Sequence, residues 1–517
     1  YKYGPNMFQL YDLPKLKQGK CAGIVASNAL GKSTIFNIFW GKIIPNFGEF
    51  NVYDKRDVIK RFNGSVLHKY FEKLYNNELV LAMKLQHIDA VQKRLNSDII
   101  VCDLFDKEIL TPEFINDFEL TPILNNKASV ISLGEFQRVS IALTCAKKAD
   151  VYMFDELSSY LDIKQRLKMA KNVRKLVTDN KYVMCIEHDL SVLDYMSDEI
   201  YCMYGQPNAF GIIAGPFGTG EGINNYLDGY IRSKNMKFRN ESLSFNKNID
   251  QDQDGTYTKY ENKTHFYPNL TKKFDSFSMR VEEGHYNDSE INVILGENGM
   301  GKTTFIKLLA GLEKSDDGTE IPQFYISIKP QNIYPNKYAD KTVRELFLDR
   351  ISDAIHNQKF NNEIIKPLGI YDVYDTKLIH LSGGYLQKVA IALALGKPAD
   401  VYLIDEPSNN LDSEQRLLVS KIIKKFIMNT HKTAFIVEHD IMMATFLADK
   451  IINVVGIPSV ESVVRPACSV QEGINYFLES IDITFRKDPE TFRPRINKFD
   501  STKDKEQKAI GMFYDCT

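Results

Sequence analysis

The sequence lacks the features that mark membrane-spanning, secreted and metal-cluster proteins. No run of 18 or more apolar residues occurs in it, whereas a membrane-spanning helix needs about 20, so we expect no membrane-spanning segment and no membrane partner. Its seven cysteines are scattered, without a C-x-x-C pair, which argues against a zinc site, an iron–sulfur cluster and a disulfide framework. A reducing, cytoplasmic compartment fits these absences best.

Neither sign of charge dominates the composition. The chain has 65 lysine and arginine side chains against 67 aspartate and glutamate side chains, so any contact with nucleic acid must come from a local basic patch. Hydrophobic residues make up 44% and charged residues 26%, which is typical of globular proteins. With 517 residues, the chain is long enough for about three or four domains.

A glycine-rich loop at residues 294–304, ILGENGMGKTT, carries the pattern G-x-x-x-x-G-K-[ST]. An apolar run precedes it and a helical pattern follows, which is the strand–loop–helix context of a phosphate-binding loop. Backbone N–H groups of such a loop face a polyphosphate, and the helix presents its positive end to it. We expect Lys302 to reach the β- and γ-phosphates and Thr303 to hold Mg²⁺. The residues expected to bind the nucleotide here are Gly296, Asn298, Gly299, Gly301, Lys302, Thr303 and Thr304.

Three sequence strings recur in register, which indicates an internal repeat. The pairs are ISLGEFQR (131–138) and LSGGYLQK (381–388), ADVYMFDELSSYLD (149–162) and ADVYLIDEPSNNLD (399–412), and CIEHD (185–189) and IVEHD (436–440). Because the offsets are 250 or 251 residues, we infer two copies of one domain of roughly 200 residues. We assign 1–205 to the first copy, 206–255 to a linker, 256–455 to the second copy and 456–517 to a C-terminal hinge.

Strand-like and helical patterns alternate along each copy, which predicts α/β domains with mostly parallel sheets. The apolar runs before Asp155 and Asp405 are continuous, as expected of central strands that are buried on both faces. Functional groups then belong at the carboxyl ends of these strands.

The first copy has an altered phosphate loop, VASNALGKST at residues 25–34. Its expected nucleotide contacts are Asn28, Gly31, Lys32, Ser33 and Thr34. Ala26 and Ala29 stand where the second copy has glycine. If these positions need a positive φ, each Cβ costs about 1–2 kcal/mol, which several hydrogen bonds to phosphate of about 1.5–3 kcal/mol each outweigh. We therefore expect weaker but retained binding.

The first copy also carries an insertion. Lys32 and Gln86 are 54 residues apart, whereas Lys302 and Gln331 are 29 apart. The apolar spacing within residues 62–84 predicts a helix–loop–helix interrupted at Asn76–Asn77. Core packing and an extra docking element are the two interpretations of this segment.

Each copy carries an aspartate–glutamate pair and a histidine at the ends of apolar runs. Glu156 and Glu406 are placed to polarise a water for in-line attack on a γ-phosphate, and His188 and His439 are expected to contact that phosphate. The expected metal ligands are Ser33, Gln86 and Asp155 in the first copy and Thr303, Gln331 and Asp405 in the second.

A serine–glycine turn in each copy implies that the copies pair head to tail. The phosphate loop, D-E pair and histidine already occupy one face, so this second set of N–H donors needs the nucleotide of the other copy. The residues concerned are Ser132 and Gly134 in the first copy and Ser382, Gly383 and Gly384 in the second. ATP would join the two copies within one monomer and hydrolysis would release them. Leu133 replaces a glycine in the first turn and Tyr385 stands where the first copy has Glu135, so the two composite sites are chemically unequal.

These motifs resemble the nucleotide-binding domains of the ATP-binding-cassette (ABC) family, and in particular its ribosome-recycling E subfamily, the RNase L inhibitor family. The strings that support the subfamily are YGPNMFQLYDLP (3–14), SSYLDIKQRLK (158–168), EHDLSVLDYMSD (187–198), EGINNYLDGY (221–230), KTAFIVEHD (432–440) and FRPRINKFDS (492–501). The resemblance implies ATP and Mg²⁺ as cofactors and ATP-driven splitting of ribosomes after termination or stalling.

The resemblance also implies partners and further contacts. The ribosome, chiefly its small subunit, would be the main partner, with release factor or Pelota and possible initiation factors beside it. The insertion would rest on the small subunit, and Tyr3 and Tyr267 would stack on adenine. Members of the family carry an N-terminal iron–sulfur domain, so we expect iron–sulfur clusters only if a further domain precedes Tyr1.

Three other functions compete with ribosome recycling. The motor subunit of a membrane transporter would not explain the insertion or the basic stretch at Phe485–Lys498. A translation factor of the related F subfamily would have a long charged helical linker, whereas 206–255 is broken by glycines. A degenerate ATPase that acts as a binding or hibernation module on idle ribosomes is favoured by the altered first phosphate loop and the altered first serine–glycine turn.

Overall fold

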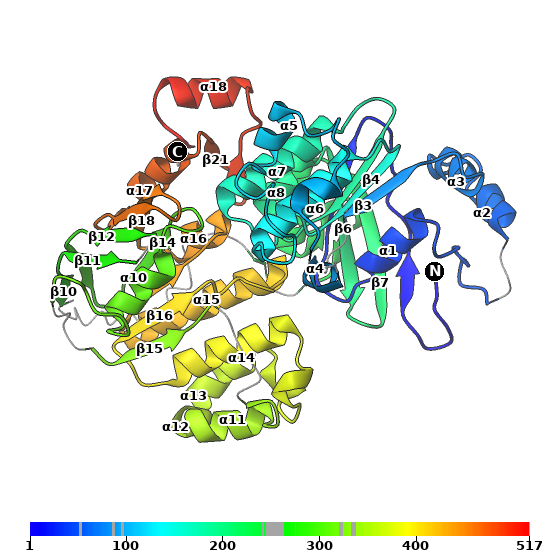
Figure 1. The fold of residues 1–517 in the computed structure, drawn as a ribbon. Coiled ribbons are helices and arrows are strands. Elements are labelled where there is room, and N and C mark those ends of the chain that lie inside the picture. Colours follow the sequence, from blue (N-terminus) through cyan, green and yellow to red (C-terminus); the bar gives the residue numbers. More distant parts are fainter. Residues whose placement is uncertain are drawn as a thin grey trace. The chain divides into compact units, whose positions relative to one another are not determined.

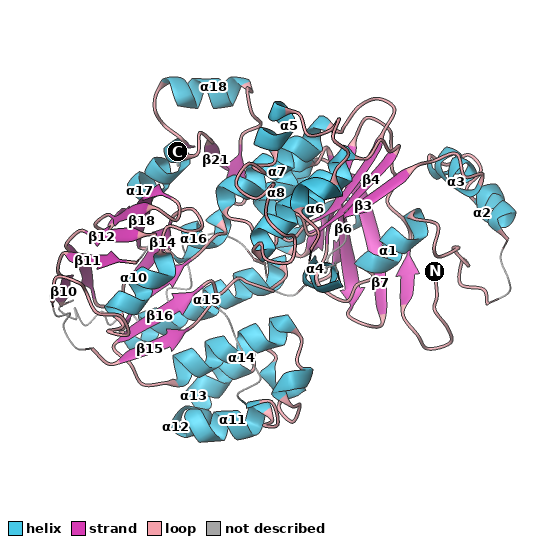
Figure 2. Ribbon diagram, viewed as in Figure 1, coloured by secondary structure: helices cyan, strands magenta, loops and turns pink. Residues whose placement is uncertain are grey.

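The computed structural model describes residues 1–50, 54–84, 88–94, 98–239, 242–243, 263–274, 276–319, 324–331 and 338–515. The chain divides into two compact units, Tyr1–Ser244 and Phe245–Thr517, which we describe one at a time (Figure 1). Within each unit, helices pack against a sheet (Figure 2). None of the helices in the described ranges is long and apolar enough to cross a membrane.

The first unit is built on a seven-stranded sheet of order β1-β7-β6-β2-β5-β4-β3. All neighbouring strands are parallel except β6 and β7. The strands are β1 (Gln9–Tyr11), β2 (Cys21–Val25), β3 (Leu81–Lys84), β4 (Val151–Asp155), β5 (Tyr182–Ile186), β6 (Glu199–Gln206) and β7 (Phe210–Phe217). Every residue of β2, β4 and β5 is buried, as predicted for central parallel strands.

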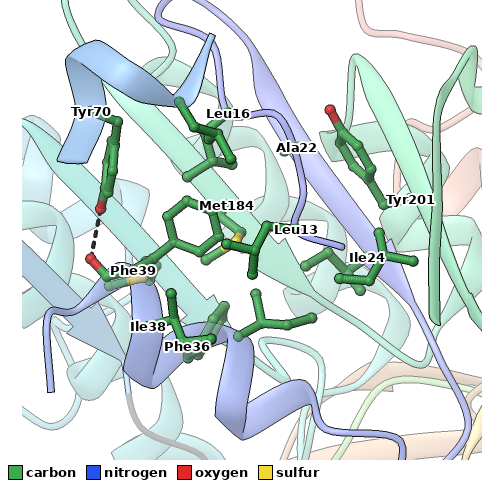
Figure 3. Packing of buried hydrophobic residues seen from close by; sticks show 14 of the residues in the cluster. Leu13, Leu16, Ala22, Ile24, Phe36, Ile38, Phe39, Tyr70, Met184 and Tyr201 are labelled. Atoms are coloured by element: carbon green, nitrogen blue, oxygen red, sulfur yellow. Dashed lines mark hydrogen bonds between the residues drawn. The ribbon is translucent and has the colours of Figure 1, made fainter. Parts of the chain in front are cut away.

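Nine α-helices of the first unit flank this sheet within the described residues. They are α1 (Lys32–Phe39), α2 (Lys55–Arg61), α3 (Leu67–Tyr75), α4 (Ile88–Arg94), α5 (Pro112–Asp117), α6 (Leu133–Ala146), α7 (Ile163–Lys175), α8 (Leu190–Met196) and α9 (Thr219–Asp228). Phe36 and Phe39 of α1 pack over Ile24 and Met184 of the sheet, and the Tyr70 hydroxyl donates a 2.7 Å hydrogen bond to the Phe39 carbonyl (Figure 3).

The predicted insertion is a helix pair, but its position is shifted. The two helices are α2 and α3, and residues 81–84 form strand β3 instead of the end of a second helix. The helical spacing ends at Asn77, whose φ of 58° stops α3. Leu79, Leu81 and Met83 alternate with a period of two, which is the pattern of a strand.

The second unit repeats this topology. Its nine-stranded sheet has the order β11-β12-β19-β18-β14-β17-β16-β15, with β20 on β18, and β10 and β13 form a separate antiparallel pair. Parallel β18-β14-β17-β16-β15 corresponds strand for strand to β6-β2-β5-β4-β3, which confirms the tandem repeat. The strands are β10 (Thr264–Tyr267), β11 (Leu270–Lys273), β12 (Ser278–Val281), β13 (Gly284–Asn287), β14 (Ile291–Leu295), β15 (Ile326–Lys329), β16 (Val401–Asp405), β17 (Thr433–Val437), β18 (Lys450–Ile457), β19 (Glu461–Val464) and β20 (Cys468–Ser469).

The helices of the second unit repeat part of the order of the first. They are α10 (Lys302–Leu309), α11 (Val343–Arg350), α12 (Ser352–His356), α13 (Gln358–Phe360), α14 (Gly383–Gly396), α15 (Ser413–Thr430), α16 (Ile441–Leu447), α17 (Val470–Ser480) and α18 (Thr502–Ala509). Of these, α10, α14, α15, α16 and α17 follow the same strands or loops as α1, α6, α7, α8 and α9 of the first unit. The last residues add a three-stranded sheet of β21 (Phe485–Lys487), β22 (Pro494–Ile496) and β23 (Tyr514–Asp515).

The predicted linker and hinge contain elements that belong to the sheets. Strand β7 and helix α9 lie within 206–255, and β7 pairs with both β1 and β6. Strand β18 runs across the expected boundary at residue 455 and pairs with β19. The predicted domain bounds follow the nucleotide-binding motifs. Each sheet continues beyond its last motif by at least two more strands, so the predicted linker and hinge include parts of the sheets.

Candidate functional site

The second phosphate loop connects β14 to α10 and depends on two left-handed glycines. Gly299 has a φ of 80° and Gly301 a φ of 79°. A Cβ on Gly301 would lie 2.5 Å from the Met279 side chain, so only glycine fits there. The Lys302 ammonium donates 2.8 Å hydrogen bonds to the carbonyls of Gly296 and Glu297, which holds it over the loop.

The first loop has the same shape with one strained residue. Ala29 has a φ of 62°, whereas Ala26 keeps an ordinary backbone conformation. The expected strain is therefore confirmed at Ala29 and wrong at Ala26. The ammonium of Lys32 donates to Asn28 Oδ1 over 3.0 Å and also contacts His188 Nε2.

A threonine and an aspartate meet at the expected metal site of the second unit. Thr303 Oγ1 donates a 2.8 Å hydrogen bond to Asp405 Oδ2. Asp405 is 2% exposed, and its buried Oδ1 has no hydrogen-bond partner among the described residues. Burial and the neighbouring Glu406 raise the pKa of Asp405. A divalent cation bound here would offset the energetic cost of burying this carboxylate. Hydroxyl and carboxylate oxygens are suitable ligands for Mg²⁺, which typically takes its other ligands from water and phosphate.

In the first unit, burial and Glu156 raise the pKa of the corresponding Asp155 to about 6, against the opposing charges of Lys32 and Lys84. Ser33 is exposed at the start of α1. Gln86, the third expected metal ligand, lies outside the described residues.

Glu406 is held by the residues that the sequence predicted beside it. Its Oε1 accepts from Gln331 Nε2 over 2.8 Å and lies 3.0 Å from His439 Nε2. Burial alone would raise the pKa of Glu406, but His439, Gln331 and Lys302 outweigh it and lower the pKa to about 2. In the first unit, His188 Nε2 lies 3.5 Å from Glu156 Oε1 and the pKa of Glu156 is likewise lowered to about 2, against burial. Such carboxylates are ionised and suited to orienting a water.

Both glutamates have a left-handed backbone, which the sequence did not reveal. The φ angle is 49° at Glu156 and 48° at Glu406, a region that non-glycine residues rarely adopt. Residues in such conformations cluster at functional sites.

Two buried lysines, Lys84 and Lys329, bind the backbone carbonyls beside these strained residues. We did not predict them from the sequence. Lys84 donates 2.8 Å hydrogen bonds to the carbonyls of Asp155 and Glu156. Lys329 donates to Asp405 O over 2.7 Å and to Glu406 O over 3.1 Å. Burial lowers the pKa of both lysines to about 8. A lysine two positions before the glutamine in both copies was the available signal.

The serines of the two serine–glycine turns, Ser132 and Ser382, cap the long helices α6 and α14 of their own units. Ser132 accepts from Glu135 N over 3.3 Å, and the Glu135 carboxylate in turn accepts from Ser132 Oγ over 2.7 Å. Ser382 caps α14 through the N–H of Tyr385, at 3.4 Å. A Cβ on Gly134 would lie 2.7 Å from a backbone oxygen, and one on Gly384 would lie 3.1 Å from another. Which nucleotide each turn covers stays a prediction.

Of the two residues predicted to stack on adenine, Tyr267 is buried in the core, so this prediction is wrong. Tyr267 is 2% exposed and packs edge-on against Phe305, with ring centroids 5.9 Å apart. It is a core residue beneath α10. Tyr3, by contrast, is 44% exposed and its hydroxyl lies 3.0 Å from Thr34 Oγ1.

Phe274 is the structural counterpart of Tyr3. It is 46% exposed and lies 6.4 Å from the Phe277 ring, which abuts Gly301. Tyr3 stands in the same relation to Phe8 of the first unit, also at 6.4 Å. Phe8 and Phe277 abut the loop glycines Gly31 and Gly301, and the nearest aromatic residues before them in the sequence are Tyr3 and Phe274, which was the available signal.

Two units that each join a phosphate loop, an aspartate–glutamate strand end and a histidine define an ATPase of the ATP-binding-cassette class. The family model described as ABC transporter matches residues 14–159 and 279–409, which lie one in each unit.

Comparisons over the whole chain narrow this class. The chain is 46% identical over 522 residues to ABC transporter E family member 1 of Arabidopsis thaliana, covering 99% of this chain and 85% of the relative. Translation initiation factor RLI1 of Saccharomyces cerevisiae is 46% identical over 521 residues, with the same shares covered. The solved structure of RNase-L Inhibitor matches with a TM-score of 0.92 and 42% identity, covering 100% of this chain and 99% of that one. The chain belongs to the E family of ABC proteins, the RNase-L inhibitor family.

Two further solved structures contain relatives in complexes. A complex of archaeal ribosomal stalk protein aP1 and archaeal ribosome recycling factor aABCE1 matches with a TM-score of 0.91 and 42% identity, covering 99% of this chain and 98% of that one. A model of ribosome-bound archaeal Pelota and ABCE1 matches with a TM-score of 0.89 and 41% identity, covering 100% and 86%.

Proposed function

We propose that this protein is an ATP-dependent ribosome-recycling factor of the cytoplasm that binds the small subunit after termination or stalling. The observation that carries this proposal is similarity along the whole chain, 99% of it, to relatives named for translation. The similarity extends to the C-terminal strands β21 to β23, which lie outside the cassette matches. Pelota or a release factor, and initiation factors, are the proposed further partners.

The exposed face of α2–α3 suits ribosomal RNA. Its buried face packs inward through Val58, Leu67, Tyr70, Phe71 and Leu74. The exposed basic side chains Lys55, Arg56, Lys60, Arg61, Lys69 and Lys73 outnumber the exposed acidic Asp54, Asp57 and Glu72. A local basic surface of this kind neutralises phosphates even though the whole chain has no basic excess.

The C-terminal stretch is a weaker candidate for phosphate contact. Arg493 is fully buried, and Arg495 lies 3.4 Å from the Asp488 carboxylate. Both residues therefore serve the fold of the second unit. Arg486 and Lys487 keep partly exposed side chains, and Lys498 is exposed.

The proposed reaction uses each residue at the atom described above. Lys32 and Lys302 would move from the loop to the β- and γ-phosphates, and Mg²⁺, held by Ser33 with Asp155 and by Thr303 with Asp405, would neutralise phosphate charge. Glu156 and Glu406 would orient the attacking water, and His188 and His439 would contact the γ-phosphate. Gln86 and Gln331 would complete the coordination of metal or water.

We further propose that the halves act as a clamp. Ser382, Gly383 and Gly384 would cover the nucleotide of the first loop, and Ser132 and Gly134 that of the second. Tyr3 and Phe274 would flank adenine.

Co-sedimentation with ribosomal subunits tests the proposal. Glu406→Gln should bind ATP but not release it by hydrolysis, so that the variant accumulates on small subunits in the presence of ATP. The wild type should do so only with a non-hydrolysable ATP analogue. Normal turnover without accumulation would contradict the clamp.

A second function, a binding or hibernation module on idle ribosomes, is favoured by two observations. Ala29 strains the first loop, and Leu133 occupies the first turn of α6. Equal sedimentation with and without nucleotide would support this alternative.

A further inference from the structure

A buried glutamate immediately precedes the histidine in each unit. Glu187 and Glu438 are each 1% exposed. A buried carboxylate is strongly unfavourable unless several donors satisfy it. Neither residue is among the expected nucleotide or metal contacts, so its burial needs another explanation.

Glu438 gathers donors from two separate loops. From the loop after β16 it accepts the N–H of Ser408 at 3.1 Å and the hydroxyl of Ser408 at 2.9 Å. From the loop after β17 it accepts the N–H groups of His439 at 3.0 Å and Asp440 at 3.3 Å. One side chain therefore joins the segment that follows Glu406 to the segment that carries the histidine.

The first unit repeats this arrangement. Glu187 accepts the Ser158 N–H at 2.9 Å and the Ser158 hydroxyl at 2.6 Å. It also accepts the N–H groups of His188 at 2.7 Å and Asp189 at 3.1 Å. All four contacts recur in both units, which argues against an accident of packing in one of them.

These contacts close a ring around the reacting groups. In the second unit, Glu406 lies two residues before Ser408, Ser408 binds Glu438, Glu438 precedes His439, and His439 returns to Glu406 at 3.0 Å. The Lys329 ammonium binds the Glu406 carbonyl from the other side of the strand end. A change in the carboxylate would therefore alter the distance between Glu406 and His439.

We propose that Glu187 and Glu438 are positioning residues that fix the separation of the water-orienting glutamate and the histidine in each unit. This proposal rests on the roles proposed above for Glu156, Glu406, His188 and His439. The carboxylate acts through backbone N–H groups and touches neither nucleotide nor metal. It sets the geometry of hydrolysis without contributing to the affinity for ATP.

The paired variant Glu187→Gln/Glu438→Gln tests this role in the full chain. Glutamine keeps the shape but points an amide donor at N–H donors, so the ring should loosen. We expect kcat for ATP hydrolysis to fall about 10- to 100-fold, as small misplacements of reacting groups do, with KM and the affinity for a fluorescent ATP analogue within about threefold of wild type. The exposed pair Glu108→Gln/Glu479→Gln is the matched control and should leave both values unchanged.

A milder variant keeps the test valid if the first one folds poorly. Ser158→Ala/Ser408→Ala removes one of the four donors from each carboxylate, and kcat should fall about threefold to tenfold at unchanged KM. Wild-type kcat in either variant, or a parallel loss of kcat and ATP affinity, would overturn the proposal.

Glu156→Gln/Glu406→Gln separates this result from failure of the proposed site. If that variant hydrolyses ATP normally, the catalytic assignment itself fails. If it is inactive while the Glu187/Glu438 variant has wild-type kcat, only the positioning role fails.

Discussion

At the scale of single residues, backbone strain distinguishes the two phosphate loops. Ala29 adopts a left-handed conformation with a φ of 62°, where the second loop has Gly299. The Cβ of a left-handed residue costs about 1–2 kcal/mol, partly offset by the lower chain entropy of alanine in the unfolded state. The first loop is thus folded at a small loss of stability that the second loop avoids.

Ala29→Gly should therefore raise the free energy of unfolding of the first unit by about 1 kcal/mol. Ala26→Gly is the matched control, because Ala26 is not strained and a glycine there only adds entropy to the unfolded chain. Urea denaturation of both variants measures the difference. Equal effects of the two substitutions would contradict this explanation.

The pKa of Glu438 makes the stability of the second unit depend on pH. Burial, together with Asp440, raises this pKa to about 7 from an ordinary value of 4.5, against the hydrogen bonds of Ser408. The folded state therefore binds more protons than the unfolded state between these two values. Stability from this group is fully present below pH 4.5 and is lost as the pH rises to about 7, by up to about 3 kcal/mol.

Glu438→Gln should remove this dependence. We expect the free energy of unfolding of the wild type, relative to the variant, to decrease by about 2 kcal/mol between pH 5 and pH 7.5. Denaturation curves at the two pH values measure it. A difference that stays constant with pH would show that Glu438 keeps the same protonation state throughout.

At the scale of elements, helices α6 and α14, which begin at the two serine–glycine turns, have different N-terminal caps. Helix α6 has a capping box in which Ser132 and Glu135 bind each other's backbone N–H groups. Helix α14 keeps only the serine half, because Tyr385 replaces the glutamate and stacks under the Lys388 ammonium at 4.0 Å. The serine hydroxyl is therefore engaged by a carboxylate in one unit alone.

Tyr385→Glu should restore the box and raise the stability of the second unit by about 0.5–1 kcal/mol. Glu135→Ala should lower that of the first unit by a similar amount. Thermal unfolding of the two variants provides the comparison. Destabilisation by Tyr385→Glu would mean that the contact of Tyr385 with Lys388 matters more than the cap.

The basic face of α2–α3 gives a second prediction at this scale. Lys60→Glu/Lys69→Glu should weaken binding to the small ribosomal subunit at least about tenfold, because each contact with phosphate adds salt-dependent affinity. ATP hydrolysis by the free protein should not change. Lys366→Glu/Lys397→Glu, on exposed lysines of the second unit, is the control, and equal weakening by both pairs would count against a docking role for α2–α3.

The elements also show how far the sequence could lead. The phosphate loops, strand-end acids and histidines lie in short strings whose spacing fixes their place in the fold, so Thr303 and Asp405 were correctly expected to meet. Tyr267 was wrong because distance along the chain to the loop says nothing about which face of β10 is buried. Residues 81–84 were assigned to a helix because three apolar residues fit either period. Lys84 and Lys329 could not be distinguished from surface lysines by residue type alone.

At the scale of the whole molecule, the repeat gives two phosphate loops that differ in backbone strain. The second loop has its full set of glycines, whereas the first carries the strain at Ala29. The Cβ of Ala29 also limits how closely the backbone of the first loop can approach a phosphate, and each loss of about 1.4 kcal/mol of affinity in this way corresponds to tenfold weaker binding. ATP should therefore bind in two steps, the tighter at the second unit.

Titration with a fluorescent ATP analogue should separate the two steps. Lys302→Ala should remove the tighter step and leave the weaker, and Lys32→Ala should do the reverse. Loss of both steps in either variant would show instead that the sites bind as one cooperative unit.

The left-handed backbone at Glu156 and Glu406 bears on how this protein can change over time. A glycine or an asparagine at either position would relax the chain, so substitution there trades activity for stability. Random drift toward a more stable protein would therefore silence hydrolysis first. We expect loss of either glutamate to be an early sequence change in any variant of this protein that gains stability at the expense of hydrolysis.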